Sequence, residues 1–309
     1  MLFQWPSLHQ IVYRVMRLRR LVAVAVMVPM LALIAMSLLS PAALPADLAT
    51  MAVAGIAALV IGHVVLFPNV TLETLALSIA ATLLVCAMPA IMAAAAWAPA
   101  AQQTGALVIL IGFAFALAGF LVLLLENLMA WMFYAGPAIK RVMTARINLP
   151  CSPQVAFQQF TLRPDTRRGR ILTGPVDDNG FFDVAVAPAA AEAMHPDHAT
   201  CVRVDAKVLE SSPARHDVML LTAEGAVTVT SQSFAATPEG CTVEVRDMPG
   251  DFTLGMYAIY WLTDQQADNL TEMSDPITGQ TPRANGIAHQ TSLMAVAGAV
   301  LSPRAPMAD

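Results

Sequence analysis

The stretch Leu21–Leu39, LVAVAVMVPMLALIAMSLL, decides the fold expected for the N-terminal half of the chain, because it contains no charged residue. Three further apolar runs follow, Ala49–Phe67, Thr74–Trp97 and Gly105–Leu125, and none of them contains a Lys or Arg. Each run is close to the ~20 residues that a helix needs to cross the hydrocarbon core of a bilayer. Because backbone polar groups cannot stay unpaired in lipid, the runs predict four transmembrane helices within residues 21–134.

Composition excludes several classes of protein. Of the 309 residues, 57% are apolar and 13% are charged, whereas an average soluble domain carries about 25% charged residues. Residues 1–146 hold seven cations and three anions, and the rest of the chain holds ten cations and nineteen anions. This pattern excludes a wholly soluble globular protein, a disordered chain and a basic nucleic-acid-binding domain, so we expect no nucleic-acid partner.

The basic residues of the membrane half predict its orientation. Cytoplasmic loops of membrane proteins are enriched in Lys and Arg, and here the cations flank the four runs while the connecting loops have none. They are Arg14, Arg17, Arg19, Arg20, Lys140, Arg141 and Arg146. Four spans also put both ends on one side. We therefore predict a multi-pass protein of the bacterial inner membrane, with the lipid bilayer as partner and both termini in the cytoplasm.

Residues 1–20 and two ionisable groups need separate interpretation. The first segment mixes arginines with apolar residues, which suits a positively charged flank or, less favoured, a short amphipathic helix on the membrane surface. His63 and Glu126 lie at or near membrane depth, where ionisable groups are functional candidates. The favoured interpretation places both near the headgroups, since His63 is four residues before Phe67 and Glu126 follows the fourth run. Both are kept as intramembrane polar candidates.

From Val142 onward, short alternating segments replace the long apolar runs. Such alternation predicts antiparallel strands with one solvated face. A short helix is expected at Gln154–Phe160, and a long closing helix at Phe252–Met273, where apolar residues recur at intervals of three or four. The predicted strands are Val142–Leu149, Arg170–Thr173, Phe181–Ala187, Val202–Leu209, Asp217–Thr222, Ala226–Phe234 and Thr242–Asp247. The fold class is thus membrane α-helical plus α+β.

Two stretches of this half resemble a known superfamily. Ala145–Phe157, ARINLPCSPQVAF, resembles its opening strand, Ser/Pro break and Val-x-Phe helix, and residues 240–245, GCTVEV, resemble its late strands. The closing helix is in the corresponding place. Residues 142–274 therefore resemble the START-like or polyketide-cyclase-like superfamily, the helix-grip fold also called SRPBCC.

This resemblance implies an antiparallel sheet wrapped around a long C-terminal helix, with an apolar cavity between them. Ligands of the superfamily are lipids, sterols, isoprenoids, polyketides and plant hormones. The alternative is that the inward side chains simply fill a core. The inward positions expected for this chain are Phe182, Val184, Val204, Val227, Val229, Val243, Met256 and Ile259.

Signatures of catalysis or cofactor binding are few. No C-x-x-C, G-x-G-x-x-G, Walker, G-x-S-x-G or H-E-x-x-H pattern occurs. His195, His198 and Cys201 have a ligand-like spacing, but zinc sites usually need four ligands in paired spacings, so we expect no metal and no cofactor. The alternation places Arg203 outward and leaves the face of His216 open. We assign no catalytic residue and favour a non-enzymatic protein over a cyclase-type enzyme.

Two functional classes remain. The first is a membrane-tethered cytoplasmic module that binds an apolar or amphipathic ligand such as a lipid, an isoprenoid or quinone, or a polyketide-like molecule. The second is an accessory or structural subunit that docks to a membrane-protein partner. The expected organisation is a basic interfacial segment (1–20), a four-span domain (21–134), a linker (135–141), an SRPBCC-like domain (142–275) and a tail (276–309). In the tail, Ser292–Leu301 is apolar but too short to span a bilayer, which suits a short docking helix or an ordered tail.

Overall fold

The computed structural model divides the chain into two compact units, which we describe separately. The helical unit comprises Phe3–Met132 together with Gln290–Asp309, and the sheet unit comprises Phe133–His289. The residues that the structure describes are 5–42, 44–97, 103–168, 171–186, 202–223, 225–281, 283–284 and 292–294. The predicted ligand-like group His195, His198 and Cys201 lies outside them.

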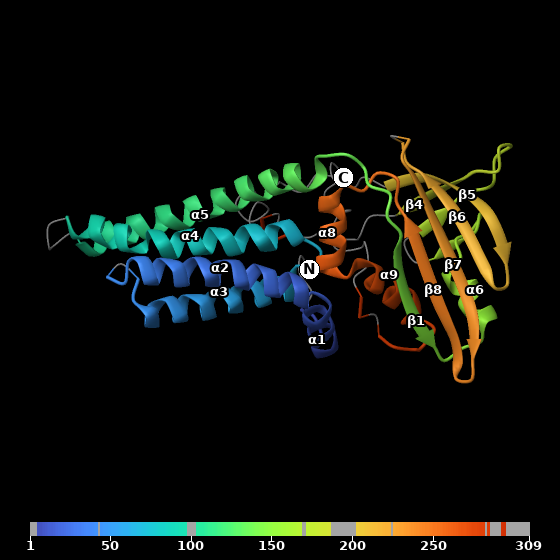
Figure 1. The fold of residues 1–309 in the computed structure, drawn as a ribbon, viewed down its shortest axis with the longest axis horizontal. Coiled ribbons are helices and arrows are strands. Elements are labelled where there is room, and N and C mark those ends of the chain that lie inside the picture. The colour runs from blue at the N-terminus through green and yellow to red at the C-terminus, as the bar shows by residue number, and fades with distance from the viewer. Residues whose placement is uncertain are drawn as a thin grey trace, which may run out of the picture. The chain divides into compact units, whose positions relative to one another are not determined.

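Four long apolar helices make up most of the helical unit, and each is long and apolar enough to cross a membrane. Figure 1 shows α2 beside α3 and α5 beside α4. Leu33 of α2 and Val60 of α3 are fully buried in their shared apolar cluster, whereas α5 is the least buried of the four. The helices of this unit are α1 (Leu8–Arg17), α2 (Arg19–Leu39), α3 (Ala46–Leu66), α4 (Thr71–Ala96) and α5 (Gln103–Tyr134).

Residues 1–20 contain a short helix, α1, which is the less favoured of the two interpretations that the sequence allows for this segment. Ser7 and Gln10 form a capping box at the start of α1, with each side chain accepting a hydrogen bond from the other's backbone N–H. Two arginines of α1 are buried: Arg14 donates to the carbonyl of Val65, and Arg17 Nη1 lies 3.4 Å from Asn69 Oδ1. These cations therefore hold α1 against the turn between α3 and α4.

An eight-stranded antiparallel sheet forms the body of the sheet unit, in the order β1-β8-β7-β6-β5-β4-β3-β2. The predicted fold class is confirmed, and the two-residue strand β2 adds to the predicted set. The strands are β1 (Met143–Leu149), β2 (Arg167–Arg168), β3 (Ile171–Thr173), β4 (Phe182–Val186), β5 (Val202–Ser212), β6 (Arg215–Leu221), β7 (Val227–Thr237) and β8 (Gly240–Met248).

Local chemistry explains the break between β1 and α6 (Pro153–Phe160). The Ser152 hydroxyl accepts from the backbone N–H of Val155, and Pro153 starts the helix, where its missing N–H costs nothing. The chain crosses β8 closely at this point. Gly240 has φ +148°, and a Cβ there would lie 2.0 Å from the carbonyl oxygen of Leu149, so only glycine fits.

The closing helix differs from the prediction because it consists of two helices, α8 (Leu254–Thr263) and α9 (Gln265–Ser274). Asp264 between them is left-handed, with φ 49° and ψ 42°, a conformation that Asp tolerates better than most residues. The Tyr257 hydroxyl of α8 bonds to backbone groups of Ile139 and Arg141 in the linker. Leu270 of α9 instead packs into the core of the sheet.

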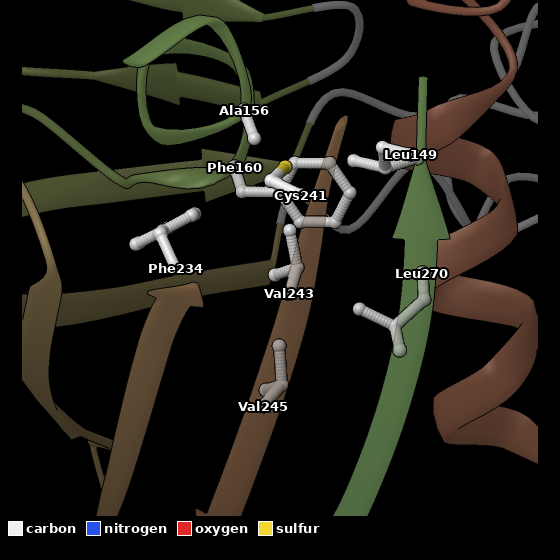
Figure 2. Packing of buried hydrophobic residues seen from close by; sticks show 8 residues of the cluster. All are labelled: Leu149, Ala156, Phe160, Phe234, Cys241, Val243, Val245 and Leu270. Carbon is white, nitrogen blue, oxygen red and sulfur yellow. The ribbon is translucent and has the colours of Figure 1, made fainter. Parts of the chain in front are cut away.

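One apolar cluster joins α6 and α9 to the sheet, as Figure 2 shows. A second cluster lies on β4, β5 and β6 and includes Phe182, Val184, Ala206 and Val218. The opposite face carries the ion pairs of Glu244 with Arg146 and Arg246. The first cluster consists of Leu149, Ala156, Phe160, Phe234, Cys241, Val243, Val245 and Leu270.

Candidate functional site

Strand register decides which predicted pocket residues face the core. Val243 pairs with Phe234, Val184 pairs with Val204, and Phe182 pairs with Ala206, so these side chains share the inner face. Phe182, Val184 and Val243 are buried, and Val204 packs against the second cluster. They form packed apolar core in both clusters.

Val227 and Val229 occupy the opposite face, which corrects the expectation that they point inward. Phe234 pairs with Val243 on the inner face, so Gln232 and Thr230, two and four residues earlier, face inward as well. Val229, which pairs with Met248, alternates with them and faces the other way. Val227 is 40% exposed. The apolar phase of β7 therefore changes along the strand, which alternation alone does not reveal.

The two predicted residues of the closing helix lie on α8. Met256 and Ile259 are half-buried there. Because α8 is fixed to the linker through Tyr257, the helix that packs into the sheet core is α9. In place of the one long helix expected against the sheet, there are two short helices, and only α9 packs into the sheet core.

His216, whose face the sequence left open, lies on the inner face and is 2% exposed. Its Nε2 is 3.0 Å from the carbonyl oxygen of Leu162, and its Nδ1 is 3.2 Å from Ser211 Oγ. Since a carbonyl oxygen can only accept, Nε2 carries the proton and Nδ1 is the acceptor. Burial lowers the pKa of His216, and the positive charge of Arg163 lowers it further, against an opposing hydrogen bond to Leu162. The imidazole is therefore neutral near pH 7.

Two polar atoms of opposite character are buried in this region. Gln232, paired with His216 across the strands, donates from Nε2 to the carbonyl of Phe160 at 3.3 Å, while its Oε1 has no hydrogen-bond partner among the described residues. Arg163 donates from Nε to Thr161 Oγ1 at 3.0 Å, and its buried Nη2 likewise has no partner in the described part of the chain. One acceptor and one donor are thus unused.

A cleft of about 170 Å³ opens between α6 and the β5–β6 hairpin, lined by Gln154, Phe157, Ser211, Ser212 and Pro213. Phe157 and Ser211 connect it to His216: the Phe157 ring stands edge-on to the imidazole at 5.9 Å. The guanidinium of Arg163 lies over the Phe157 ring, with its Cζ 5.3 Å from the ring centroid. The cleft is smaller than the roughly 300–1,000 Å³ of pockets for whole drug-sized ligands.

This arrangement combines a neutral base, a cation and an apolar wall. His216 Nδ1 can accept a proton from the Ser211 hydroxyl or from a bound hydroxyl group. Arg163 can bind a carboxylate, phosphate or carbonyl oxygen. Among the described residues, no group of three or more His, Cys, Asp or Glu side chains is placed to hold a metal ion. The site therefore favours recognition of a polar head attached to an apolar body.

The predicted intramembrane candidates gather around a residue that the sequence reasoning missed. His63 Nε2 is 2.7 Å from Glu73 Oε1, and His63 Nδ1 is 3.0 Å from Thr74 Oγ1. His63 and Glu73 are 4% and 1% exposed, so both side chains are enclosed by the helical unit. Glu126 of α5 lies close enough to interact electrostatically with both. The available signal was the position of Glu73 in the first turn of α4, across a short turn from His63.

A second hollow lies in the helical unit. It measures about 440 Å³ and runs between α4 and α5. The lining side chains that the structure describes are all apolar, and many are alanines. They are Ala80, Leu83, Leu84, Ala87, Ala90, Ile91, Ala94, Leu110, Phe113, Ala114, Leu117, Ala118 and Leu121. We call it the α4–α5 groove.

Comparisons with known proteins give no family assignment. No protein-family model matches the chain, and no curated protein matches it. Among solved structures, CV1439 from Chromobacterium violaceum is 14% identical, with a TM-score of 0.33 over 45% of this chain and 96% of that one. MLL2253 from Mesorhizobium loti is 12% identical, with a TM-score of 0.33 over 45% and 97%. The di-domain ARO/CYC StfQ from the steffimycin biosynthetic pathway is 12% identical, with a TM-score of 0.33 over 59% and 62%. Similarities this weak assign no function to the chain.

Proposed function

We propose that this protein is a membrane-tethered module whose sheet unit binds an amphipathic ligand at the cleft between α6 and the β5–β6 hairpin. The observation that carries the proposal is the pair of unused buried atoms, Gln232 Oε1 and Arg163 Nη2, around a neutral His216. A buried polar group without a partner costs about 1–3 kcal/mol. A ligand head that donates to Gln232 and accepts from Arg163 recovers this cost.

The chemistry of the site restricts the ligand class. A carboxylic acid, a phosphate monoester or a hydroxyketone offers both a donor and an acceptor, and its apolar part would lie against Phe157. The small cleft suits the head of such a molecule, with the rest of the ligand outside it or admitted by movement of α6. Lipids, isoprenoids and polyketide-like molecules all satisfy this description. The four apolar helices would keep the unit beside a bilayer that dissolves such ligands.

A second candidate function is an accessory subunit of a membrane complex. It is favoured by the packed core of the sheet unit and by the surface of α5, where Phe113 and Phe115 are each 66% exposed. Large apolar side chains on a transmembrane helix face either lipid or a partner helix. Under this proposal the sheet unit is a scaffold and the cleft has no ligand.

A photoreactive fatty acid tests the two functions. The full-length protein in phospholipid nanodiscs would be irradiated with a diazirine-containing, alkyne-tagged fatty acid, and labelled peptides would be identified by mass spectrometry. The binding proposal expects labelling of the 153–160 and 211–215 segments. Arg163→Met and Gln232→Leu should each reduce it several-fold, whereas Arg246→Met, an exposed arginine on the opposite face of the sheet, should leave it unchanged.

The result that rejects the binding proposal is equally specific. If label appears only in the four long helices, or if both variants label like the native protein, the cleft is not the ligand site. Recovery of a stoichiometric protein partner by native mass spectrometry, with no label in the sheet unit, would favour the accessory subunit.

A further inference from the structure

Glu73 binds a segment from the far end of the chain. Its Oε1 accepts from the backbone N–H of Leu293 at 2.8 Å, and its Oε2 accepts from that of Met294 at 3.3 Å. The chain becomes helical at Leu293, so these are N–H groups at the start of a helical turn, where a negative charge is favourable. Glu73 itself lies in the first turn of α4. The Glu73 carboxylate thus lies at the start of α4, accepts from the backbone of residues 293–294 and contacts His63.

The side chain of Met294 continues this contact into the helical unit. It packs on the apolar cluster that Ala76 and Ala80 of α4 form with Val122 of α5. Leu121 belongs to the same cluster, and Ala80 and Leu121 also line the α4–α5 groove. The interface made by Met294 is therefore continuous with the groove, and from Glu73 it runs along α4 toward Ala80.

The chain that follows Met294 has the composition to enter this groove. Residues 295–301 are Ala-Val-Ala-Gly-Ala-Val-Leu, and Arg304 is the first charged residue after Ser292. Small residues allow close approach of helices in lipid, and the α4 side of the groove presents Ala80, Ala87, Ala90 and Ala94.

Length agrees with this placement. Seven residues in a helix span ~10 Å, while the α4 side of the groove from Ala80 to Ala94 spans ~21 Å at 1.5 Å per residue. The segment would therefore occupy the half of the groove nearest Glu73.

We propose that the α4–α5 groove is the docking site of the C-terminal segment 292–301, with Glu73 as its anchor. His63 holds the Glu73 carboxylate in place from the side of α3. The segment fills part of a surface that lipid chains or another helix would otherwise cover, so its release would expose a new apolar surface. This inference is independent of the ligand proposed for the sheet unit.

Site-specific photo-crosslinking tests the docking. Full-length protein with p-benzoylphenylalanine at Val296 would be irradiated in phosphatidylcholine–phosphatidylglycerol nanodiscs, and crosslinked peptides would be mapped by mass spectrometry. Crosslinks to the groove-lining parts of α4 and α5 are expected. Glu73→Ala should lower their yield about tenfold, because it removes two charge-assisted hydrogen bonds. The matched control is Asp47→Ala, which removes the first-turn acid of α3 instead.

A second variant covers the case in which Glu73→Ala fails to fold. Met294→Asp leaves the His63–Glu73 pair intact and places a charge against the apolar cluster, so it should also abolish the groove crosslinks. Crosslinks to lipid alone, to the sheet unit alone, or to a differently tagged second copy would overturn the proposal. Groove crosslinks that persist at full yield in either variant would overturn it as well.

Discussion

Truncating one buried valine and one exposed valine measures which face of the sheet is the core. Val243 is fully buried between Phe160 and Phe234, whereas Val227, on the other face, is 40% exposed. Val→Ala removes two methyl groups, worth ~0.8 kcal/mol each, and leaves a cavity that adds ~1 kcal/mol when the site is closed. Val243→Ala should therefore lower the free energy of unfolding by ~2–3 kcal/mol, and Val227→Ala by less than ~1 kcal/mol.

Hydrogen exchange measured by mass spectrometry on the full-length protein in nanodiscs reports this difference. Peptides from β7 and β8 should exchange roughly 30–140-fold faster in Val243→Ala, because each 1.4 kcal/mol corresponds to a factor of ten. In Val227→Ala they should exchange within a few-fold of the native rate. Because both variants lose the same atoms, the difference reports how deeply each valine is buried. Equal acceleration in both, or a larger effect at Val227, would refute the assignment of the inner face.

Four further predictions concern orientation, pH, thiols and backbone. A C-terminal reporter should score cytoplasmic and one inserted near Asp47 external; the opposite result would remove the assigned compartment. Burial lowers the pKa of His216 below its ordinary 6.5, so the contribution of this neutral imidazole to the stability of the sheet unit should be fully present above about pH 6.5 and be lost as the pH falls below it. Thermal denaturation of His216→Gln should show a flatter pH dependence, and an unchanged one would contradict this. Burial and Cys151 raise the pKa of the Cys241 thiol to about 11, so about 0.1% is thiolate at pH 8 and iodoacetamide should label it slowly, as peptide mapping would show. Gly240→Ala should lower the melting temperature of the sheet unit because its Cβ would overlap the Leu149 carbonyl; an unchanged melting temperature would contradict the close crossing.

The fold class was predictable because it follows from the length of the apolar runs and from the spacing of apolar residues along the chain. Leu21–Leu39 and the other apolar runs leave a helix as the only backbone structure compatible with lipid. The break at Ser152–Pro153 has a local cause that is visible in the sequence. By contrast, the division of the closing helix at Asp264 depends on what α8 contacts. Tyr257 binds the linker over a separation of more than a hundred residues, and no local pattern reports that.

The candidate site was only partly predictable, for two physical reasons. In β7 the apolar residues Val227 and Val229 are out of phase with Phe234, so alternation supports either face until pairing with β8 fixes it. Buried polar groups such as His216 and Gln232 have no apolar period at all. Their place follows from tertiary partners, here the backbone carbonyls of Leu162 and Phe160. The same holds for Glu73, whose partners lie 10 and more than 200 residues away.

Glu73 joins the membrane helices to the C-terminal segment, and the order of the helices explains why both meet at this residue. In the predicted four-span arrangement, the end of α3, the start of α4 and the end of α5 share one side of the membrane. The structure brings His63, Glu73 and Glu126 of these three elements together. An acid enclosed among apolar helices is tolerated only when donors surround it. His63 supplies one donor, and the backbone of residues 293–294 supplies two. Since the orientation predicted from charge places the C-terminal half on that same side, the tail can reach Glu73 without crossing the bilayer. An external C-terminus would therefore contradict both the orientation and the docking of the tail.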